Sequence, residues 1–222
     1  MTKMPHPDVV PQLEAIPLDS TRPLVVCDAD DVLFHFLAGF AAFLVERGLY
    51  FDWTSYSLDG TIHFAEDKRP LALEKAGALL NEFFDHVEDL EPIEGASRAL
   101  GVIAEWAQIV IMTNIPARVS EGRRRSLDRH GLSYPMVTNI GGKGPAVKYL
   151  ASRAGRPTVF IDDMPRQHAS VAKTSREVVL LHFVAEPRIE ALLGEAPQCH
   201  HKATSWPEAQ RIVAGVLNGN AG

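Results

Sequence analysis

The chain is poor in cysteine. Its 222 residues include only Cys27 and Cys199. Small secreted domains that depend on disulfides carry more cysteines, and Cys27 lies in a predicted buried strand. The sequence therefore argues against a disulfide scaffold, and we expect a cytoplasmic protein in a reducing compartment.

Long apolar runs and an excess of positive charge are also missing. No run reaches the roughly 20 apolar residues of a membrane-spanning helix. Residues 1–7 lack the apolar centre of a signal peptide, so we expect an unprocessed chain with no membrane partner. Lys and Arg total 22 against 28 Asp and Glu, a net charge of −6. This balance argues against a nucleic-acid polymer as partner but not against a single nucleotide.

The length and composition that remain are those of a globular protein. With 46% hydrophobic residues, the chain can build one domain plus an insertion. Apolar strand-like runs alternate with helical segments from about residue 21 onward. This alternation predicts an α/β fold, a Rossmann-like doubly wound parallel sheet of about five strands with helices on both faces.

One short apolar run ends abruptly in acids. Residues 24–27 (Leu-Val-Val-Cys) predict a buried strand, and Asp28 and Asp30 follow it directly. Open α/β sheets bind ligands at this end of their strands. Two carboxylates so close repel each other, and a hard cation such as Mg²⁺ would neutralise them. The alternative is that the acids only cap the next helix.

Three later segments carry polar residues where a strand ends or a helix begins. These residues are Thr113 and Asn114, then Lys143, then Asp162 and Asp163. Lys148 is the rival of Lys143, but it falls inside a predicted helix, whereas Lys143 lies on a glycine-rich turn.

In this order the segments resemble the four motifs of the haloacid dehalogenase-like (HAD) phosphohydrolase superfamily: Asp-x-Asp-x-Val/Thr, apolar-Thr/Ser, Lys, and apolar-Asp-Asp. The resemblance covers nearly everything from about residue 21. It implies a catalytic core of residues 21–33 and 91–222 and a helical cap, residues 34–90, inserted after the first strand. Residues 1–20 hold four prolines and predict an irregular N-terminal arm on the surface.

The resemblance also implies a role for each acid of the first motif. Asp28 would attack phosphorus and form an aspartyl-phosphate. Asp30 would protonate the leaving oxygen and later activate water. Superfamily members with a different reaction, such as dehalogenases, lack the second acid, so Asp30 favours a phosphatase.

The other motif residues would bind phosphate and metal. Thr113, Asn114 and Lys143 would hold the phosphoryl oxygens. Mg²⁺ would lie between Asp28, the backbone carbonyl of Asp30, Asp163 and Asp162. The chain departs from the superfamily pattern at Asp31, where glycine is frequent, and at Gln167, where a further acid is frequent.

A closer resemblance is to the 5′(3′)-deoxyribonucleotidases. It is carried by residues 28–36, Phe83 and Phe84, residues 90–96, Thr113, Lys143 and residues 160–163. In that family the aromatic residue that matches Phe36 stacks on the nucleobase. Core packing explains Phe36 equally well. Further cap aromatics contribute in that family, and Trp53 and Tyr56 are the candidates here.

The expected function is that of a Mg²⁺-dependent phosphomonoester hydrolase, with a nucleoside monophosphate as the first choice of substrate. A sugar phosphate or another small phosphorylated metabolite is the alternative within this class. A catalytically idle binding module is the alternative from another class, but it would not need Asp30. We expect a monomer or a homodimer.

Three further patterns have a plainer interpretation. The Arg123-Arg124-Arg125 run predicts a solvated helix face rather than a ligand site. The Cys199-His200-His201 run lacks the spacing of a structural zinc site, and His182 is predicted to pack within a strand. Ser205 and Glu208 predict a capping box for the last helix.

Overall fold

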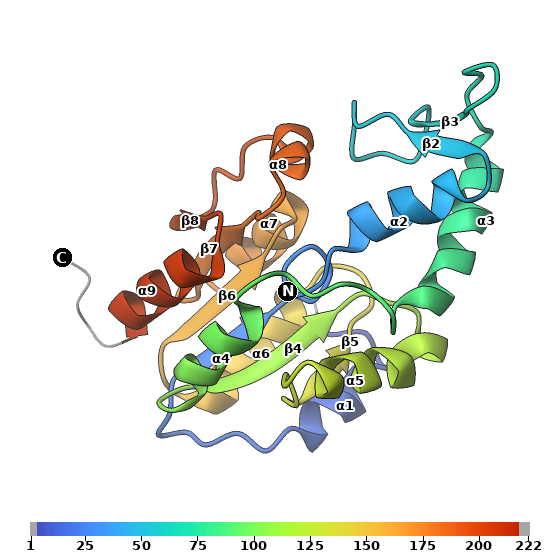
Figure 1. Cartoon of the computed structure of the whole chain (residues 1–222). Helices are drawn as coiled ribbons and strands as arrows, with labels where there is room; N and C mark the ends of the chain where they lie inside the picture. Colours follow the sequence, from blue (N-terminus) through green and yellow to red (C-terminus); the bar gives the residue numbers. More distant parts are fainter. Residues whose placement is uncertain (1–3, 218–222) are drawn as a thin grey trace.

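A parallel sheet lies between two layers of helices in the computed structural model, which describes residues 4–217 (Figure 1). The six strands run in the order β5-β4-β1-β6-β7-β8, and all neighbours are parallel. They are β1 Leu24–Cys27, β4 Gln108–Thr113, β5 Met136–Thr138, β6 Thr158–Asp162, β7 Val179–Phe183 and β8 His201–Ala203. The predicted doubly wound α/β fold is confirmed, with short β8 added at one edge.

Alternation along β1 separates the core into two halves. Val25 and Cys27 pack on one face with α4 and α9, whereas Leu24 and Val26 pack on the other with α1, α6 and α7. Both faces are covered, which is why the central strands β1, β4 and β6 are mainly apolar, whereas the edge strand β8 is largely exposed. The helices of this part are α1 Val10–Ala15, α4 Ala96–Ala104, α5 Ser120–Arg129, α6 Gly144–Ala154, α7 Pro165–Thr174, α8 Pro187–Leu193 and α9 Trp206–Leu217, with the 3₁₀ turn η2 Ala117–Val119 before α5.

We use the name cap segment for residues 34–90, which lie between β1 and α4. The segment contains α2 Phe36–Val45, the antiparallel pair β2 Leu49–Phe51 and β3 Ile62–Phe64, α3 Leu73–Phe83 and the 3₁₀ turn η1 Phe84–His86. In Figure 1 it projects from one end of the sheet, at the upper right. Within it, α2 begins at Phe36 after an irregular turn, and β2 begins at Leu49.

The N-terminal arm is more ordered than its prolines predicted. Pro11 occupies the first turn of α1, where its missing N–H costs nothing. Leu13 is fully buried against α6 and the sheet. The Gln12 side-chain oxygen accepts a hydrogen bond from the Thr138 backbone N–H at 2.9 Å. The expectation of an irregular arm is therefore wrong over α1.

The start of α9 also differs from the prediction. The Glu208 carboxylate accepts a hydrogen bond from the Thr204 backbone N–H at 2.9 Å, rather than from Ser205. The acid thus reaches one residue further back than a capping box requires. No helix in the described part of the chain is long and apolar enough to cross a bilayer.

Candidate active site

The carboxyl ends of three neighbouring strands bring the predicted residues together. Because β1 lies between β4 and β6, Thr113 ends one neighbour of β1 and Asp162 ends the other. Asp28 continues the ladder, since its backbone N–H donates to the Ile161 carbonyl at 2.9 Å. This is the edge at which parallel α/β sheets bind ligands.

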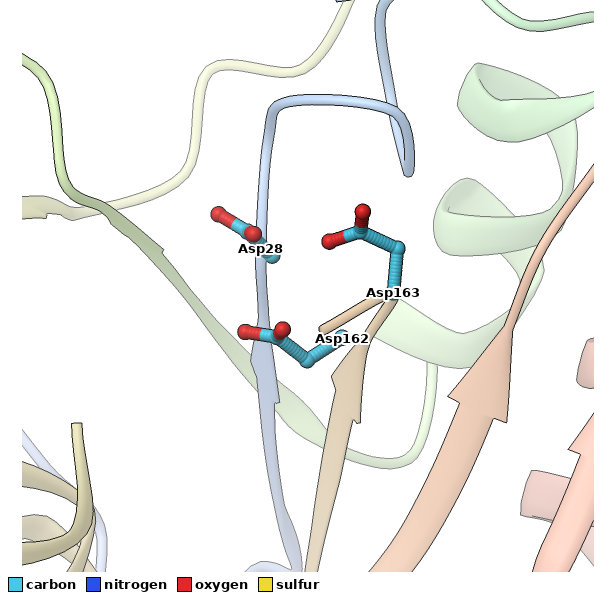
Figure 2. A group of neighbouring side chains, drawn as sticks. All are labelled: Asp28, Asp162 and Asp163. Atoms are coloured by element: carbon cyan, nitrogen blue, oxygen red, sulfur yellow. The ribbon is translucent and has the colours of Figure 1, made fainter. Parts of the chain in front are cut away.

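Three buried carboxyl groups form a compact cluster at this edge. Figure 2 shows Asp28 at the end of β1 and Asp162 and Asp163 at the end of neighbouring β6. One carboxylate oxygen from each lies within 4.8 Å of the others. Asp162 has no exposed surface, and the other two are nearly inaccessible to solvent. We call these residues the metal-side acids.

Lys143 neutralises part of this cluster. Its Nζ lies 2.7 Å from Asp28 Oδ1 and 2.7 Å from Asp162 Oδ2. Burial opposes its charge, but the carboxylates of Asp162 and Asp28 raise the pKa of Lys143 above its usual value. Lys148 lies further along α6 and is only half-buried. The lysine brought to the acids is therefore Lys143.

Helix α7 holds the turn that carries Lys143. Gln167 Oε1 accepts a hydrogen bond from the Lys143 backbone N–H at 2.8 Å, and Ser170 Oγ accepts one from the Gly144 N–H at 3.0 Å. A Cβ on Gly144 would lie only 2.1 Å from the Ser170 carbonyl oxygen. Only glycine permits this approach. Gln167 thus holds the turn through its side chain, at the position where many HAD sequences carry an acid.

The metal-side acids fit a hard cation. Asp163 Oδ2 is buried and has no hydrogen-bond partner among the described residues. Burial raises the pKa of Asp163 well above its usual value, and burial raises that of Asp28 to about 6 against the opposing charge of Lys143. Carboxylate oxygens are the ligands that Mg²⁺ prefers, so Asp28, Asp162 and Asp163 could hold this ion.

Asp30 faces a different partner. Its Oδ1 accepts a hydrogen bond from Nη2 of Arg123, and its Oδ2 accepts one from Thr113 Oγ1 at 3.3 Å. Burial raises the pKa of Asp30, while the Arg123 charge works against that shift. The Asp30 carboxyl group is thus held by Arg123 and Thr113, whereas Lys143 pairs with Asp28 and Asp162.

The position of Arg123 corrects the sequence interpretation. It was expected on a solvated face, yet it has no exposed surface. Only its neighbours Arg124 and Arg125 reach the periphery, where Arg125 pairs with Glu88. Helical spacing contained the signal, because Arg123 lies four residues from both Val119 and Leu127, which are buried.

Asp31 links the turn after β1 to the cap segment. Its φ of +55° lies in the left-handed region, which explains why glycine suits this position in the superfamily. Its carboxylate accepts hydrogen bonds from the Leu37 N–H at 3.1 Å and the Tyr56 hydroxyl at 3.5 Å. Burial raises the pKa of Asp31 to about 8. We call Asp30 and Asp31 the cap-side acids.

Phe36 and Asn114 lie at the periphery of the site. The half-buried Phe36 ring packs against Phe83 and Phe84, with centroid separations of 5.2 and 5.6 Å. Asn114 is exposed, and its Nδ2 donates to the Gly141 carbonyl at 2.8 Å. Its side chain therefore joins two loops of the site. Trp53, elsewhere in the cap segment, lies under the Arg188 guanidinium at 4.0 Å from the ring centroid.

Two histidines that sequence reasoning did not assign to the site support its backbone. Nε2 of His168 lies 2.8 Å from the Asp162 carbonyl oxygen, and Nε2 of His182 lies 2.7 Å from that of Asp163. Burial lowers the pKa of His168 to about 4, so its ring is neutral and donates from Nε2. His182 lies in β7, as expected. Both rings fix the peptide units next to the metal-side acids.

The histidines near the C-terminus form no comparable group. His200 Nδ1 accepts a hydrogen bond from the Leu180 N–H at 2.9 Å, which ties its loop to β7. Within residues 4–217, the metal-side acids are the only set of side chains spaced to hold a metal ion.

Comparison with known proteins identifies the fold. Neither a protein-family model nor a curated protein matches the sequence. Among solved structures, a haloacid dehalogenase-like protein from Agrobacterium tumefaciens matches with a TM-score of 0.58, 14% identity, and coverage of 86% of this chain and 97% of that one. A HAD-hydrolase from Bacillus subtilis bound to magnesium matches with a TM-score of 0.57 and 14% identity, over 86% of this chain and 98% of that one. A protein from Haemophilus somnus described as a predicted phosphoglycolate phosphatase matches with a TM-score of 0.57 and 11% identity, over 86% of this chain and 97% of that one. The chain therefore has the fold of HAD-superfamily hydrolases.

Proposed function

We propose that this chain is a Mg²⁺-dependent phosphomonoester hydrolase that acts through an aspartyl-phosphate. The observation that carries the proposal is the joint placement of Asp28 beside Lys143 and of Asp30 beside Thr113, at the carboxyl edge of a HAD-type sheet. Neighbours in structure that are described as a phosphatase and as a magnesium-bound hydrolase support it.

The chemistry needs two steps. In the first, an Asp28 oxygen forms a bond to phosphorus while the bond from phosphorus to the leaving oxygen breaks. Asp30 gives its proton to that oxygen. In the second, water attacks phosphorus and returns a proton to Asp30, and the bond to Asp28 breaks. Phosphate and an alcohol are released, and both carboxyl groups return to their starting forms.

Positive charge and hydrogen-bond donors would stabilise the transferring group. Lys143 already lies 2.7 Å from Asp28 and is oriented by Asp162, so it can contact a phosphoryl oxygen without rearrangement. The Thr113 hydroxyl and the neighbouring Asn114 backbone supply neutral donors. Mg²⁺ would be held by Asp28, Asp163, Asp162 and the Asp30 carbonyl, and when bound it would neutralise the acids and polarise a phosphoryl oxygen.

The cap segment would close the site. Tyr56 from the loop between β2 and β3 reaches Asp31, and Arg118 from η2 contacts Asp85 at 2.9 Å. Both contacts join the segment of residues 34–90 to the core of residues 21–33 and 91–222. Closing such a lid excludes water and strengthens the electrostatic interactions inside.

A nucleoside monophosphate is the substrate that we favour. Phe36 begins α2 directly after the turn that carries the cap-side acids, and the residue is only half-buried. A sugar phosphate or another small phosphorylated metabolite is the alternative. We further propose that the protein is cytoplasmic and is a monomer or homodimer.

Phosphate release tests this function. Purified protein is incubated with a panel of nucleoside monophosphates, sugar phosphates and 4-nitrophenyl phosphate, with Mg²⁺ and with a chelator. We expect hydrolysis that stops in chelator and resumes with Mg²⁺. Release from no member of the panel would favour the idle binding module, and equal rates in chelator would contradict the metal assignment.

A further inference from the structure

Helix α5 turns one arginine of its run inward and the next two outward. Arg123 has no exposed surface, whereas the side chain of Arg125 is 59% exposed. Arg124 donates to the Tyr134 carbonyl, and Arg125 pairs with Glu88. Arg123 alone among the three reaches the candidate active site.

The guanidinium of Arg123 is held between an acid and an aromatic ring. Nη2 donates to Asp30 Oδ1, and the guanidinium carbon lies 4.8 Å from the centre of the Phe34 ring. Phe34 is itself fully buried. An arginine between these two groups has little freedom to rotate, so it presents Nη2 to Asp30 in one direction.

The remaining donors of Arg123 indicate that this arginine is costly to bury. Nε and Nη1 are buried and have no hydrogen-bond partner within residues 4–217. Burying a guanidinium with unsatisfied donors is unfavourable, and apolar residues often replace such ion pairs without loss of stability. Packing alone therefore gives a poor account of Arg123, whereas orientation of Asp30 gives a direct one.

The two oxygens of Asp30 are thereby distinguished. Oδ1 accepts the hydrogen bond from Arg123, and within residues 4–217 Oδ2 has only the 3.3 Å contact with Thr113 Oγ1. Thr113 ends β4 beside Asp28, where the phosphoryl group would lie. Oδ2 is thus the oxygen turned toward the reaction, and Oδ1 is the oxygen by which the carboxyl group is held.

We propose that Arg123 is a positioning residue, which orients Asp30 so that Oδ2 delivers a proton to the leaving oxygen and later takes one from water. This proposal rests on the proposed phosphatase function. Arg123 contacts no reacting atom and acts only through Asp30. Its removal should therefore slow proton transfer and leave the attack of Asp28 on phosphorus unaffected.

A series of aryl phosphates with leaving groups from phenol to 4-nitrophenol separates these two effects. The 4-nitrophenolate ion is a weak base and leaves without accepting a proton. Phenolate is a stronger base, so its departure depends far more on a proton from Asp30. We expect Arg123→Met to lower kcat/KM for phenyl phosphate by about 100-fold, within the range of misplaced general acids. For 4-nitrophenyl phosphate kcat/KM should barely change, while kcat falls because water activation in the second step also uses Asp30.

Arg124→Met is the matched control, because it removes an arginine of the same helix that donates to the Tyr134 carbonyl in the core instead of to Asp30. It should leave kcat/KM unchanged along the whole series. The double variant Asp30→Asn/Arg123→Met adds a second test. If Arg123 acts only through Asp30, the double variant should be no slower on phenyl phosphate than Asp30→Asn alone.

Three results would overturn the positioning role: an equal loss for all leaving groups, no loss in Arg123→Met, or multiplying losses in the double variant. Arg123→Lys keeps a buried cation with a single donor group. It should lose less kcat/KM than Arg123→Met, and the loss should again be larger for phenyl phosphate than for 4-nitrophenyl phosphate. If Arg123→Met does not fold, the series is read from Arg123→Lys, where an ungraded loss or no loss again overturns the proposal. Wild-type protein that hydrolyses no aryl phosphate would instead contradict the proposed function itself.

Discussion

The metal-side and cap-side acids lie at one sheet edge but are neutralised by different means. Asp28 and Asp162 share Lys143, and Asp163 retains a buried oxygen that has no partner among the described residues. Asp30 pairs with Arg123 of α5, and Asp31 accepts hydrogen bonds from Leu37 and Tyr56 of the cap segment. The first group is therefore left with unmatched negative charge, whereas the carboxyl groups of the second are held by contacts with other parts of the protein.

This difference separates two kinds of electrostatic organisation. A carboxylate cluster short of positive charge is unfavourable in the empty protein and gains most when an ion binds. A carboxyl group held by a fixed arginine is oriented before any ligand arrives. Binding of an ion would therefore relieve the repulsion among the metal-side acids. The Asp30 carboxyl group, in contrast, is already oriented by Arg123 without a ligand.

The largest expected effect breaks the metal side at the nucleophile. Asp28→Asn should lower phosphate release from 4-nitrophenyl phosphate by at least about 10⁴-fold, because an amide cannot form the aspartyl-phosphate. The fold should persist, since the amide has nearly the same shape. Rates and melting temperature of the two proteins, measured side by side, check both points. Substantial turnover in the folded variant would sink the proposed mechanism.

The next effect concerns the cap side and its aromatic residue. If nucleotides are the substrates, Phe36→Ala should lower kcat/KM for a nucleoside monophosphate roughly fivefold to over a hundredfold, since base stacking contributes about 1–3 kcal/mol. Hydrolysis of a small phosphate without a ring should change much less.

Phe40→Leu is the control for Phe36. Phe40 lies one turn further along α2 and is fully buried, so its truncation should lower stability and affect both substrates alike. Equal losses on both substrates for Phe36→Ala, together with a fall in melting temperature like that of the control, would count against the nucleotidase proposal.

The two sides also differ in how far the sequence predicted them. The metal side could be located from strand-end patterns, because Asp28, Thr113 and Asp162 each follow an apolar run and the sheet order brings those ends together. Lys143 followed from its glycine turn. These features are local in sequence, so a pattern of a few residues carries them.

The cap side depends on contacts between distant segments. Arg123 meets Asp30 across 93 positions of the chain, and Tyr56 reaches Asp31 from a loop with no clear pattern. A charged run favours a solvated face on average, and only the buried neighbours of Arg123 reveal the exception. Helix α1 in the N-terminal arm was not predicted for a similar reason. It is stabilised by the packing of Leu13 against α6 and not by a local sequence pattern.

A smaller effect tests how the metal side is supported. Gly144→Ala places a methyl group against the Ser170 backbone, which cannot rotate away. We expect a loss of roughly 1–3 kcal/mol in stability from overpacking and a weaker phosphatase as Lys143 shifts. Gly77→Ala is the control, because no atom of the described residues outside its own helix lies within 4 Å of its Cβ position in α3, and alanine should stabilise that helix. Thermal unfolding of both variants decides it, and a neutral Gly144→Ala would contradict the close approach of α6 and α7.

The smallest effect concerns the charge of the empty metal side. Burial raises the pKa of Asp163, so the folded protein disfavours its ionised form and loses stability as pH rises through the raised pKa. Asp163→Asn removes this charge. Without metal at neutral pH, the variant should melt about 2–4 °C higher than wild type, which corresponds to roughly 1 kcal/mol.

Magnesium should reverse that order. Wild type should gain stability with Mg²⁺ by mass action, about 2.7 kcal/mol at a hundred times the dissociation constant, and Asp163→Asn should gain much less. Scanning calorimetry with and without Mg²⁺ measures both shifts. Equal magnesium stabilisation of the two proteins would place the ion elsewhere.

Detection of the covalent intermediate tests the central claim most directly. Asp30→Asn should slow its hydrolysis, so this variant is mixed with 4-nitrophenyl phosphate and Mg²⁺, quenched in acid, digested and examined by mass spectrometry. We predict one phosphoryl group on the peptide that contains Asp28, and none when Asp28 is also changed to Asn. A phosphoryl group on another residue, or rapid phosphate release from wild type with no adduct on Asp28 in either protein, would contradict the account.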